Sequence, residues 1–220
     1  SCSLRRWVSA VRTPGFSPGC TSFYGGSVGF TKLELEAFRD QPVDDLIGPG
    51  VRLLFIGINP GLWTAATNTH FARPGNRFYP ALYLAGITDR LLDPSAGLDQ
   101  AARQQLVGRG VGITNLVNRA TVRADELSAA ELQEGAASLG EFVEEWQPRV
   151  AAVLGVTAYR IGFSRPRAVA GRQPESLGGA DVFVLGNPSG LNAHETAASL
   201  ARSCHMAAEA AGVPLDPPRW

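Results

Sequence analysis

The sequence is poor in cysteine and lysine and contains no long hydrophobic run. Its three cysteines, Cys2, Cys20 and Cys204, are odd in number and far apart, so they fit neither a disulfide framework nor a zinc or iron–sulfur site. We expect Cys204 to be a buried structural thiol on a helical face, in a protein of the reducing cytoplasm. No apolar stretch approaches the roughly 20 residues that cross a bilayer, and residues 1–12 lack the apolar segment of a signal peptide. No membrane partner is therefore expected.

The charges of the chain balance, because 20 basic and 20 acidic residues give a formal net charge of zero. This balance argues against non-specific coating of nucleic acid. Lys32 is the only lysine, so 19 of the 20 basic residues are arginine. Since arginine makes the better forked contacts to phosphate, a local positive groove on a neutral protein remains open.

The length of 220 residues and the hydrophobic content of 45% describe a globular protein with a sizeable core. Residues 1–30 are rich in Ser, Gly, Pro and Thr without a period, which predicts a flexible N-terminal extension. No internal repeat or linker divides residues 40–212. We predict a single domain over residues 31–212, a tail over 213–220, and a monomer.

Apolar runs and helical spacings alternate along the predicted domain. Short apolar runs predict strands over residues 51–58, 111–117, 150–154 and 182–185. Spacing signals predict a helix over residues 31–39, a helix over 74–84 with Pro74 in its first turn, and a short helix that ends at 161. Capping signals predict a helix that opens at the capping box of residues 128–131 and a last helix that begins after Asn192 as N-cap and ends at about 211. Strands that alternate with helices predict βαβ units. The expected fold is a three-layer α/β/α sandwich around a mostly parallel sheet of four to five strands.

Polar residues directly follow several of the predicted strands. The first strand ends at Asn-Pro-Gly (59–61), the second at Thr-Asn (114–115) and the last at Asn-Pro-Ser (187–189). Ligands in such folds lie just beyond the carboxyl ends of the strands. Each loop alone is equally well an ordinary turn, because Asn, Pro and Gly are turn formers. Their recurrence after two different strands favours a functional site at one edge of the sheet.

The residue types at this edge exclude several chemistries. The histidines His70, His194 and His205 lack ligand spacing, so no metal is expected. Gly-rich phosphate loops and the Gly-x-Ser-x-Gly elbow are absent, and no cofactor is expected. Asparagine is neither a general base nor a nucleophile and can only exchange hydrogen bonds. A central Asn59 therefore fits a reaction with a good leaving group, in which positioning and electrostatics carry most of the barrier.

Longer motifs around these loops resemble a known enzyme family. Residues 57–62 (Gly-Ile-Asn-Pro-Gly-Leu) and 70–79 (His-Phe-Ala-Arg-Pro-Gly-Asn-Arg-Phe-Tyr) resemble the first signature of the mismatch-specific uracil-DNA glycosylases, the branch that includes the thymine-DNA glycosylases. Residues 187–191 resemble the second signature, and residues 112–121 and 128–139 also look like that family. The resemblance spans about residues 45–212.

The resemblance implies a uracil-DNA glycosylase-like fold and a monofunctional DNA glycosylase. Such an enzyme flips uracil, and in some cases thymine or a modified pyrimidine, out of mismatched double-stranded DNA. It then hydrolyses the N-glycosidic bond and leaves an abasic site for base excision repair. The chain fits neighbouring branches less well, since Asn59 and Asn187 stand where the most active enzymes have Asp and His.

The resemblance also implies roles for individual residues. Asn59 would hold the attacking water, Phe71 would stack on the flipped base, and the backbone near Ile58 would bind the pyrimidine edge. Phe71 is alternatively a plain core residue. Further pocket residues implied in this way are Thr64, Asn115 (with an open role) and Asn187.

The second signature would form a DNA-intercalating loop at residues 190–194. There Gly190 precedes Leu191, which would be the apolar wedge. Known members carry an arginine in this loop that meets the orphaned guanine, whereas this chain has Asn192, Ala193 and His194. We therefore expect a softer preference for the opposing base.

Polar and basic residues beside the motifs would contact the DNA backbone. Ser189 would hold a phosphate or, alternatively, serve only as a structural cap of its turn. Arg73, Arg77 and Arg119 flank the motifs and would bridge phosphates.

Two other functions stay open on the sequence alone. One is a damage-sensing DNA-binding module without catalysis, because Asn is a weak catalyst. The other is a hydrolase of free nucleosides. Leu191 argues against the second, since a wedge has no use on a small substrate.

Overall fold

The computed structural model describes residues 29–193 and 195–220, and its centre is a twisted sheet. The strands are β1 (Leu53–Gly57), β2 (Val111–Asn115), β3 (Val150–Leu154), β4 (Gly171–Leu177) and β5 (Ala180–Leu185). They lie in the order β2-β1-β3-β5-β4. The first four in this order are parallel, and β4 pairs antiparallel with β5. The predicted mostly parallel sheet is confirmed.

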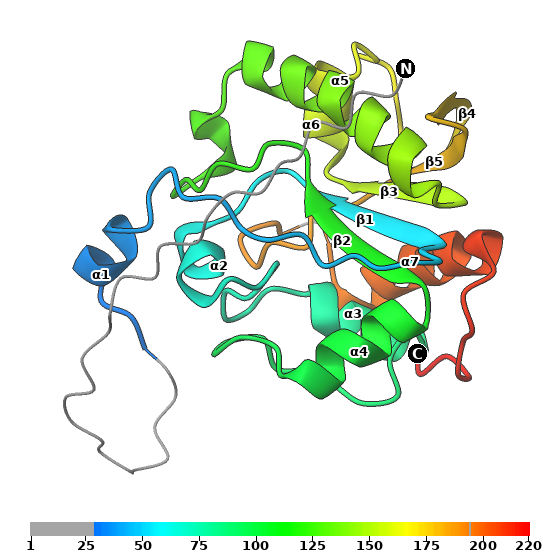
Figure 1. Ribbon diagram of the computed structural model, residues 1–220, viewed down its shortest axis with the longest axis horizontal. Coiled ribbons are helices and arrows are strands. Elements are labelled where there is room, and N and C mark those ends of the chain that lie inside the picture. Colours follow the sequence, from blue (N-terminus) through cyan, green and yellow to red (C-terminus); the bar gives the residue numbers. More distant parts are fainter. Residues whose placement is uncertain (1–28, 194) are drawn as a thin grey trace, which may run out of the picture.

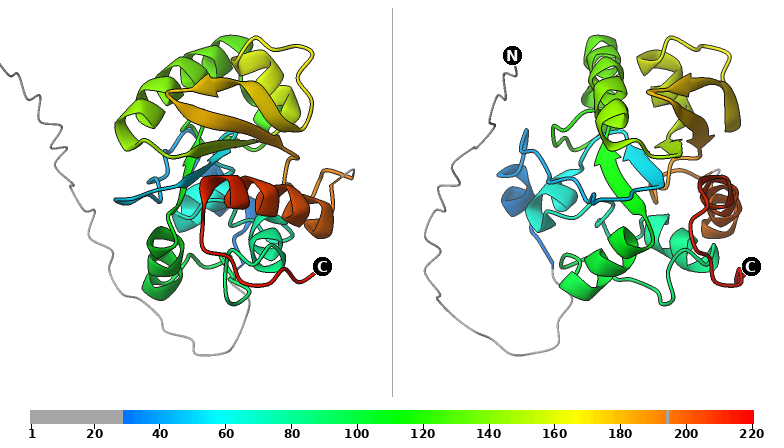
Figure 2. Two further views of the ribbon diagram at one scale, coloured as in Figure 1. Left: turned by 90° about the vertical axis from the view of Figure 1, so that its right-hand side faces the viewer. Right: turned by 45° about the vertical axis from the view of Figure 1, so that its right-hand side comes forward.

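Helices cover both faces of the sheet and complete the three layers (Figures 1 and 2). One face carries α5 (Ala129–Trp146) and α6 (Val156–Gly162), and the other carries α3 (Phe78–Leu84), α4 (Gln100–Gly108) and α7 (Ala197–Ala211). The remaining helices are short: α1 (Lys32–Glu36), α2 (Leu62–Thr67) and the 3₁₀ helix η1 (Ala124–Glu126). The short helix α2 begins soon after the carboxyl end of β1 and so leads away from the polar loop there.

The central strands are buried on both faces, as their uninterrupted apolar sequences require. In β1, Leu53 and Phe55 point into the cluster shared with α3 and α7, whereas Leu54 and Ile56 point into the cluster shared with α5 and α6. All four side chains are 0% exposed. Each such burial stabilises the fold by about 1.5–3 kcal/mol. The strand therefore provides a rigid base for the loop that begins at Ile58.

Two predicted helix starts are wrong. The helix predicted from residue 74 begins only at Phe78, because Gly75 has a φ of 83° that no helix accepts, and Asn76 Oδ1 accepts a hydrogen bond from the Phe78 N–H at 2.9 Å. The last helix is capped by Thr196 and not by Asn192. Thr196 Oγ1 accepts a hydrogen bond from the Ser199 N–H at 3.0 Å, and the two residues form a capping box.

Four elements have no prediction in the sequence, and one of them is the short 3₁₀ helix η1. The helix α2 follows the Asn-Pro-Gly loop without a polar cap. The helix α4 begins after Asp99, whose Oδ1 accepts a hydrogen bond from the Ala102 N–H at 2.7 Å. The strand β4 contains Pro174 and charged residues. As an edge strand with an irregular register against β5, β4 tolerates the proline.

The C-terminal residues 213–220 form no helix or strand but pack against α3. Val213 is 6% exposed, and the Arg219 guanidinium lies 4.4 Å from the centre of the Tyr83 ring and donates to the Tyr83 carbonyl at 2.7 Å. Nearby on α7, Cys204 is a fully buried free thiol, as expected, and burial raises its pKa. Within residues 29–193 and 195–220, no helix has both the length and the hydrophobicity needed to cross a membrane.

Candidate active site

A cleft of about 540 Å³ opens at the carboxyl ends of the parallel strands, a size typical of small-ligand sites. Four of the predicted residues line it from the segment that follows β1: Ile58, Asn59, Thr64 and Phe71. Four more line it from β2 and from the loop after β5: Asn115, Asn187, Ser189 and Leu191. Residues far apart in the sequence thus meet at the predicted edge of the sheet.

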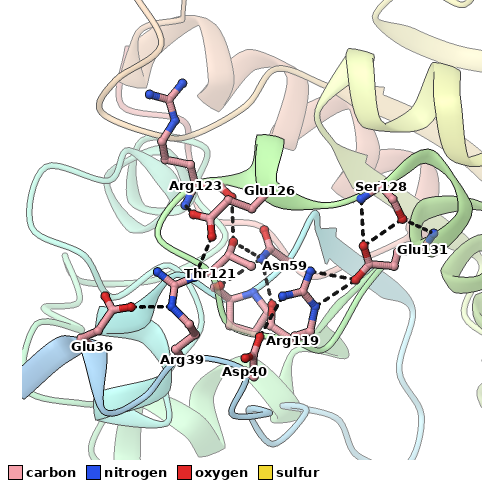
Figure 3. A network of polar contacts seen from close by, with 11 residues as sticks. Glu36, Arg39, Asp40, Asn59, Arg119, Thr121, Arg123, Glu126, Ser128 and Glu131 are labelled. Atoms are coloured by element: carbon pink, nitrogen blue, oxygen red, sulfur yellow. Dashed lines mark hydrogen bonds and ion pairs between the residues drawn. The ribbon is translucent and has the colours of Figure 1, made fainter.

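The Asn59 amide has a defined orientation (Figure 3). Its Nδ2 donates to the Arg119 carbonyl at 2.9 Å and to Thr121 Oγ1 at 2.7 Å, and lies 3.2 Å from the Pro60 carbonyl. Carbonyl oxygens only accept, so this end of the amide is the NH₂ group. Asn59 Oδ1 accepts no hydrogen bond from any described residue. The cleft therefore contains a fixed neutral acceptor that can hold a water molecule by its O–H.

Thr121 is the residue that sequence reasoning missed. Its side chain is 1% exposed, receives the Asn59 bond and donates to the Arg123 carbonyl at 2.8 Å. The Thr121 N–H donates to the Pro60 carbonyl at 3.1 Å, which pairs its loop with the loop after β1. No periodic pattern marks Thr121. Only the parallel pairing of β1 with β2, which brings both following loops together, could have indicated it.

His70 determines the orientation of a second amide. Its Nε2 lies 3.1 Å from the Asp44 carbonyl and therefore carries the proton. Burial lowers the pKa of His70 to about 4, so the ring is neutral at pH 7 and Nδ1 is an acceptor. The Asn115 side chain, 3.3 Å from Nδ1, must then donate with Nδ2. Its Oδ1 points towards Gly57, where a Cβ would lie only 2.6 Å away, so glycine is required at that position.

The ring of Phe71 belongs both to the core and to the cleft wall. It packs on Phe78 with 4.1 Å between ring centres, and it also lines the cleft. Its backbone has a φ of 57°, which is uncommon for a bulky residue. Backbone strain of this kind persists only where the surroundings impose it. One neighbour that does so is Tyr79, whose hydroxyl donates to the His70 carbonyl at 3.1 Å.

The loop after β5 presents a third fixed amide, Asn187, and a turn that includes Ser189 and Leu191. Asn187 Oδ1 accepts from the Ser189 N–H at 2.9 Å, so its Nδ2 is the end available as a donor in the cleft. Ser189 Oγ accepts from the Leu191 N–H at 3.3 Å and so caps the turn. The Leu191 side chain is 75% exposed at the cleft. His194 lies outside the described residues.

Arg77 connects the two signature loops and does not line the cleft. Its side-chain Nη1 donates to the carbonyls of Ser189 at 2.6 Å and Asn192 at 3.0 Å. The backbone N–H of Arg77 donates to the Pro188 carbonyl at 2.9 Å. Gly190 lies against the backbone of Gly75, because a Cβ on residue 190 would be only 2.7 Å from the Gly75 carbonyl oxygen. Arg77 thus holds the Leu191 loop in place, while the phosphate contact expected of it stays a prediction.

The arginines at the cleft differ in how much charge they offer. Arg119 forms ion pairs with Asp40 and Glu131, each at 2.8 Å, and Arg123 forms one with Asp125 at 2.6 Å. These ion pairs weigh against the phosphate contact expected of Arg119, which stays a prediction. Arg73 lines the cleft, is exposed, and makes no side-chain hydrogen bond or ion pair with the described residues. Among the described arginines that line the cleft, Arg73 is therefore the one whose charge no described carboxylate neutralises.

Carboxylates, thiols and imidazoles do not gather in the described part of the chain into any group of three or more that could hold a metal ion. A second hollow of about 390 Å³ lies beside α5 and is lined by Asp45, Glu131 and Glu134. Its carboxylates would repel phosphate, so it does not suit DNA.

Comparison with known proteins defines the class. Residues 45–210 match the model of the uracil DNA glycosylase superfamily. The match covers most of the chain, and the protein therefore belongs to this superfamily. Membership supports a uracil DNA glycosylase-type function with DNA as the substrate. The solution structure of a candidate uracil DNA glycosylase from Methanosarcina acetivorans has the same fold, with a TM-score of 0.51, 13% identity and coverage of 76% of this chain and 97% of that one.

Proposed function

We propose that the protein is a monofunctional DNA glycosylase that excises uracil from mismatched duplex DNA. Further pyrimidines such as thymine are second candidates. The observation that supports this best is the Asn59 amide, whose NH₂ is held by Thr121 and the Arg119 carbonyl while Oδ1 stays in the cleft. A neutral acceptor of this kind suits hydrolysis in which the leaving group departs first.

The cleft fits a flipped pyrimidine. Extruding a nucleotide costs a few kcal/mol, and least at a mismatch. The exposed Leu191 would fill the vacated place in the duplex. Phe71 would stack on the base, a contact worth about 1–3 kcal/mol. Asn115 Oδ1 would accept from the N3–H of uracil or thymine, which cytosine lacks.

Bond breaking would precede bond making. The C1′–N1 electron pair leaves with the base, whose anion is stabilised by backbone N–H groups near Ile58 and by the free Asn187 Nδ2. An oxocarbenium-like sugar remains. A water that donates to Asn59 Oδ1 directs its lone pair at C1′, forms the new C–O bond and releases its proton to the departing base or to solvent. No strong base is needed, which explains how an asparagine suffices.

The opposing base would be read only weakly. Leu191 plugs the duplex by shape, whereas a guanine edge requires matched donors and acceptors, and Ala193 offers none from its side chain. Uracil opposite guanine would still be preferred, because the wobble pair is easier to open.

The test is an alkali-cleavage assay on labelled DNA that contains uracil opposite guanine, uracil opposite adenine, thymine opposite guanine, or single-stranded uracil. We expect efficient cleavage at uracil opposite guanine and slower cleavage opposite adenine. Failure to form any abasic site would contradict an enzyme and favour a silent damage sensor. Failure to bind duplex DNA would favour a nucleoside hydrolase. Untouched uracil opposite adenine would refute the softened specificity.

A further inference from the structure

A segment outside the family match lies against the loops that form the cleft. Residues 30–44, which we call the N-terminal strap, precede the matched range of 45–210. The strap contains α1, and its Phe30 ring meets the Trp63 ring of α2 edge-on at 4.9 Å between ring centres. Because Asp44 also supplies the carbonyl that His70 binds, the strap contacts the residue that orients the Asn115 amide.

The strap binds the loop of residues 118–126, here called the Thr121 loop, through the backbone. The Asp40 N–H donates to the Ala120 carbonyl at 2.9 Å, and the Ala120 N–H donates to the Gln41 carbonyl at 3.1 Å. Asn118 exchanges two hydrogen bonds of 2.9 Å with the backbone of Val43. These bonds fix the position of the Thr121 loop beside β1.

Ion pairs connect the strap and the Thr121 loop at both ends of the loop (Figure 3). Arg39 pairs with Glu126 at 2.7 Å, and Asp40 pairs with Arg119 at 2.8 Å. Glu126 in turn accepts from the Arg123 N–H at 2.8 Å, and so closes the turn that follows Thr121. The charges of the strap therefore act on both sides of Thr121.

The Thr121 loop provides two of the acceptors that orient Asn59. They are the Arg119 carbonyl and Thr121 Oγ1. The strap itself makes no hydrogen bond with Asn59. If the loop shifts, the amide loses the partners that distinguish its two ends, and Nδ2 can replace Oδ1 in the cleft. A donor in that position cannot hold the attacking water by its proton.

We propose that the N-terminal strap is a positioning element of the active site, in which Arg39 and Asp40 keep the Asn59 amide in its reactive orientation through the Thr121 loop. The inference rests on the proposed function. Both ion pairs are partly exposed, so each shifts the equilibrium between the ordered and the displaced loop by at most about fivefold. Removing both should slow excision about three- to tenfold.

The double variant Arg39→Gln/Asp40→Asn removes both charges; it keeps the side-chain size at position 40 and shortens the side chain at position 39. Asparagine also tolerates the φ of 61° at position 40. The rate of uracil excision is measured in single turnover at saturating enzyme, together with affinity for a product-like abasic duplex. We expect a slower excision rate and an unchanged affinity for the abasic duplex. The difference in excision rate between the variant and the wild type should become smaller at high salt. Arg39→Lys should retain most of the rate. The matched control is Arg172→Gln, which breaks the exposed Arg172–Asp181 pair on the β4 edge and should leave the rate unchanged.

A second readout does not depend on activity. The side-chain amide signals of Asn59, assigned by their loss in Asn59→Ala, report the hydrogen bonds of Nδ2 by hydrogen exchange. Faster exchange in the double variant is expected. Wild-type exchange in that variant would overturn the strap's role, whatever the excision rate. A wild-type protein without excision activity would instead refute the proposed function, and the exchange result would still decide the role of the strap.

Discussion

Asn59 has no charge at any pH, so its contribution depends on orientation alone. The amide is polarised by what it already binds, with acceptors at Nδ2 and an unbonded Oδ1 in the cleft. Asn115 has the same arrangement through His70. The hydrogen-bond partners of Asn59 and Asn115 thus fix which end of each neutral amide is the NH₂ donor and which is the oxygen acceptor.

Asn59→Ala should retain DNA binding and lose most of the excision rate, because only the positioning of water is removed. We expect a loss of about 2–4 kcal/mol of transition-state stabilisation. Single-turnover kinetics measure the excision rate, and titration with an abasic duplex measures DNA binding. Near-normal excision would exclude the assigned role.

His70 should make stability depend on pH. Burial lowers its pKa from 6.5 to about 4, so between these values the unfolded state binds more protons, and stability falls as pH falls. From pH 7 to pH 5 this effect amounts to about 2 kcal/mol. Urea unfolding at both pH values measures it.

His70→Gln is the comparison for this effect, since it removes the titration. Its stability should change less between pH 7 and pH 5 than that of the wild type, while other groups titrate equally in both proteins. An equal change would mean that His70 is not held neutral.

Among the elements, the buried strands and the loops after them could be predicted from sequence, whereas the supports of those loops could not. Unbroken apolar runs identify β1 and β3, and the Asn-Pro motifs after β1 and β5 indicate the cleft edge. Thr121 and Arg39 carry no such signal, because their effect arises from contacts between segments far apart in the chain. Local turn chemistry misled at Asn192, whose Nδ2 bonds the Asn187 carbonyl instead of capping α7.

Leu191→Ala should lower excision from duplex DNA far more than from single strands, where nothing needs to be plugged. Burying a leucine side chain contributes about 1.5–3 kcal/mol, so we expect a loss of roughly 10- to 100-fold on duplexes. Because Leu191 is 75% exposed in the free protein, the fold should be unaffected. Equal losses on both substrates would argue against a wedge.

At the scale of the molecule, a net charge of zero means that DNA affinity depends on a few uncompensated cations. Arg73 lines the cleft without an ion pair to a described residue, whereas Arg119 is neutralised by two carboxylates. Most of the architecture could be predicted from the alternation of strands and helices. The compensation of charge could not, because partners such as Asp40 and Arg119 are distant in sequence.

Arg73→Ala should weaken DNA binding and reduce the slope of log affinity against log salt by about 1. Arg119→Ala should leave this slope unchanged, since its charge is already balanced within the protein. Binding titrations at several salt concentrations measure both. A smaller slope for Arg119→Ala would mean that it releases its carboxylates to meet phosphate.

The absence of charge on the side chains assigned to the chemistry has a consequence for how the enzyme would respond to pH. The side chains assigned to the chemistry (Asn59, Asn115, Thr121 and Asn187) are amides and a hydroxyl that do not ionise near neutrality, and His70 gains its proton only around pH 4. A pH–rate profile should therefore be flat between about pH 6 and 9, without the bell shape of paired acid and base groups. Repair would proceed at the same pace in a cell whose internal acidity drifts.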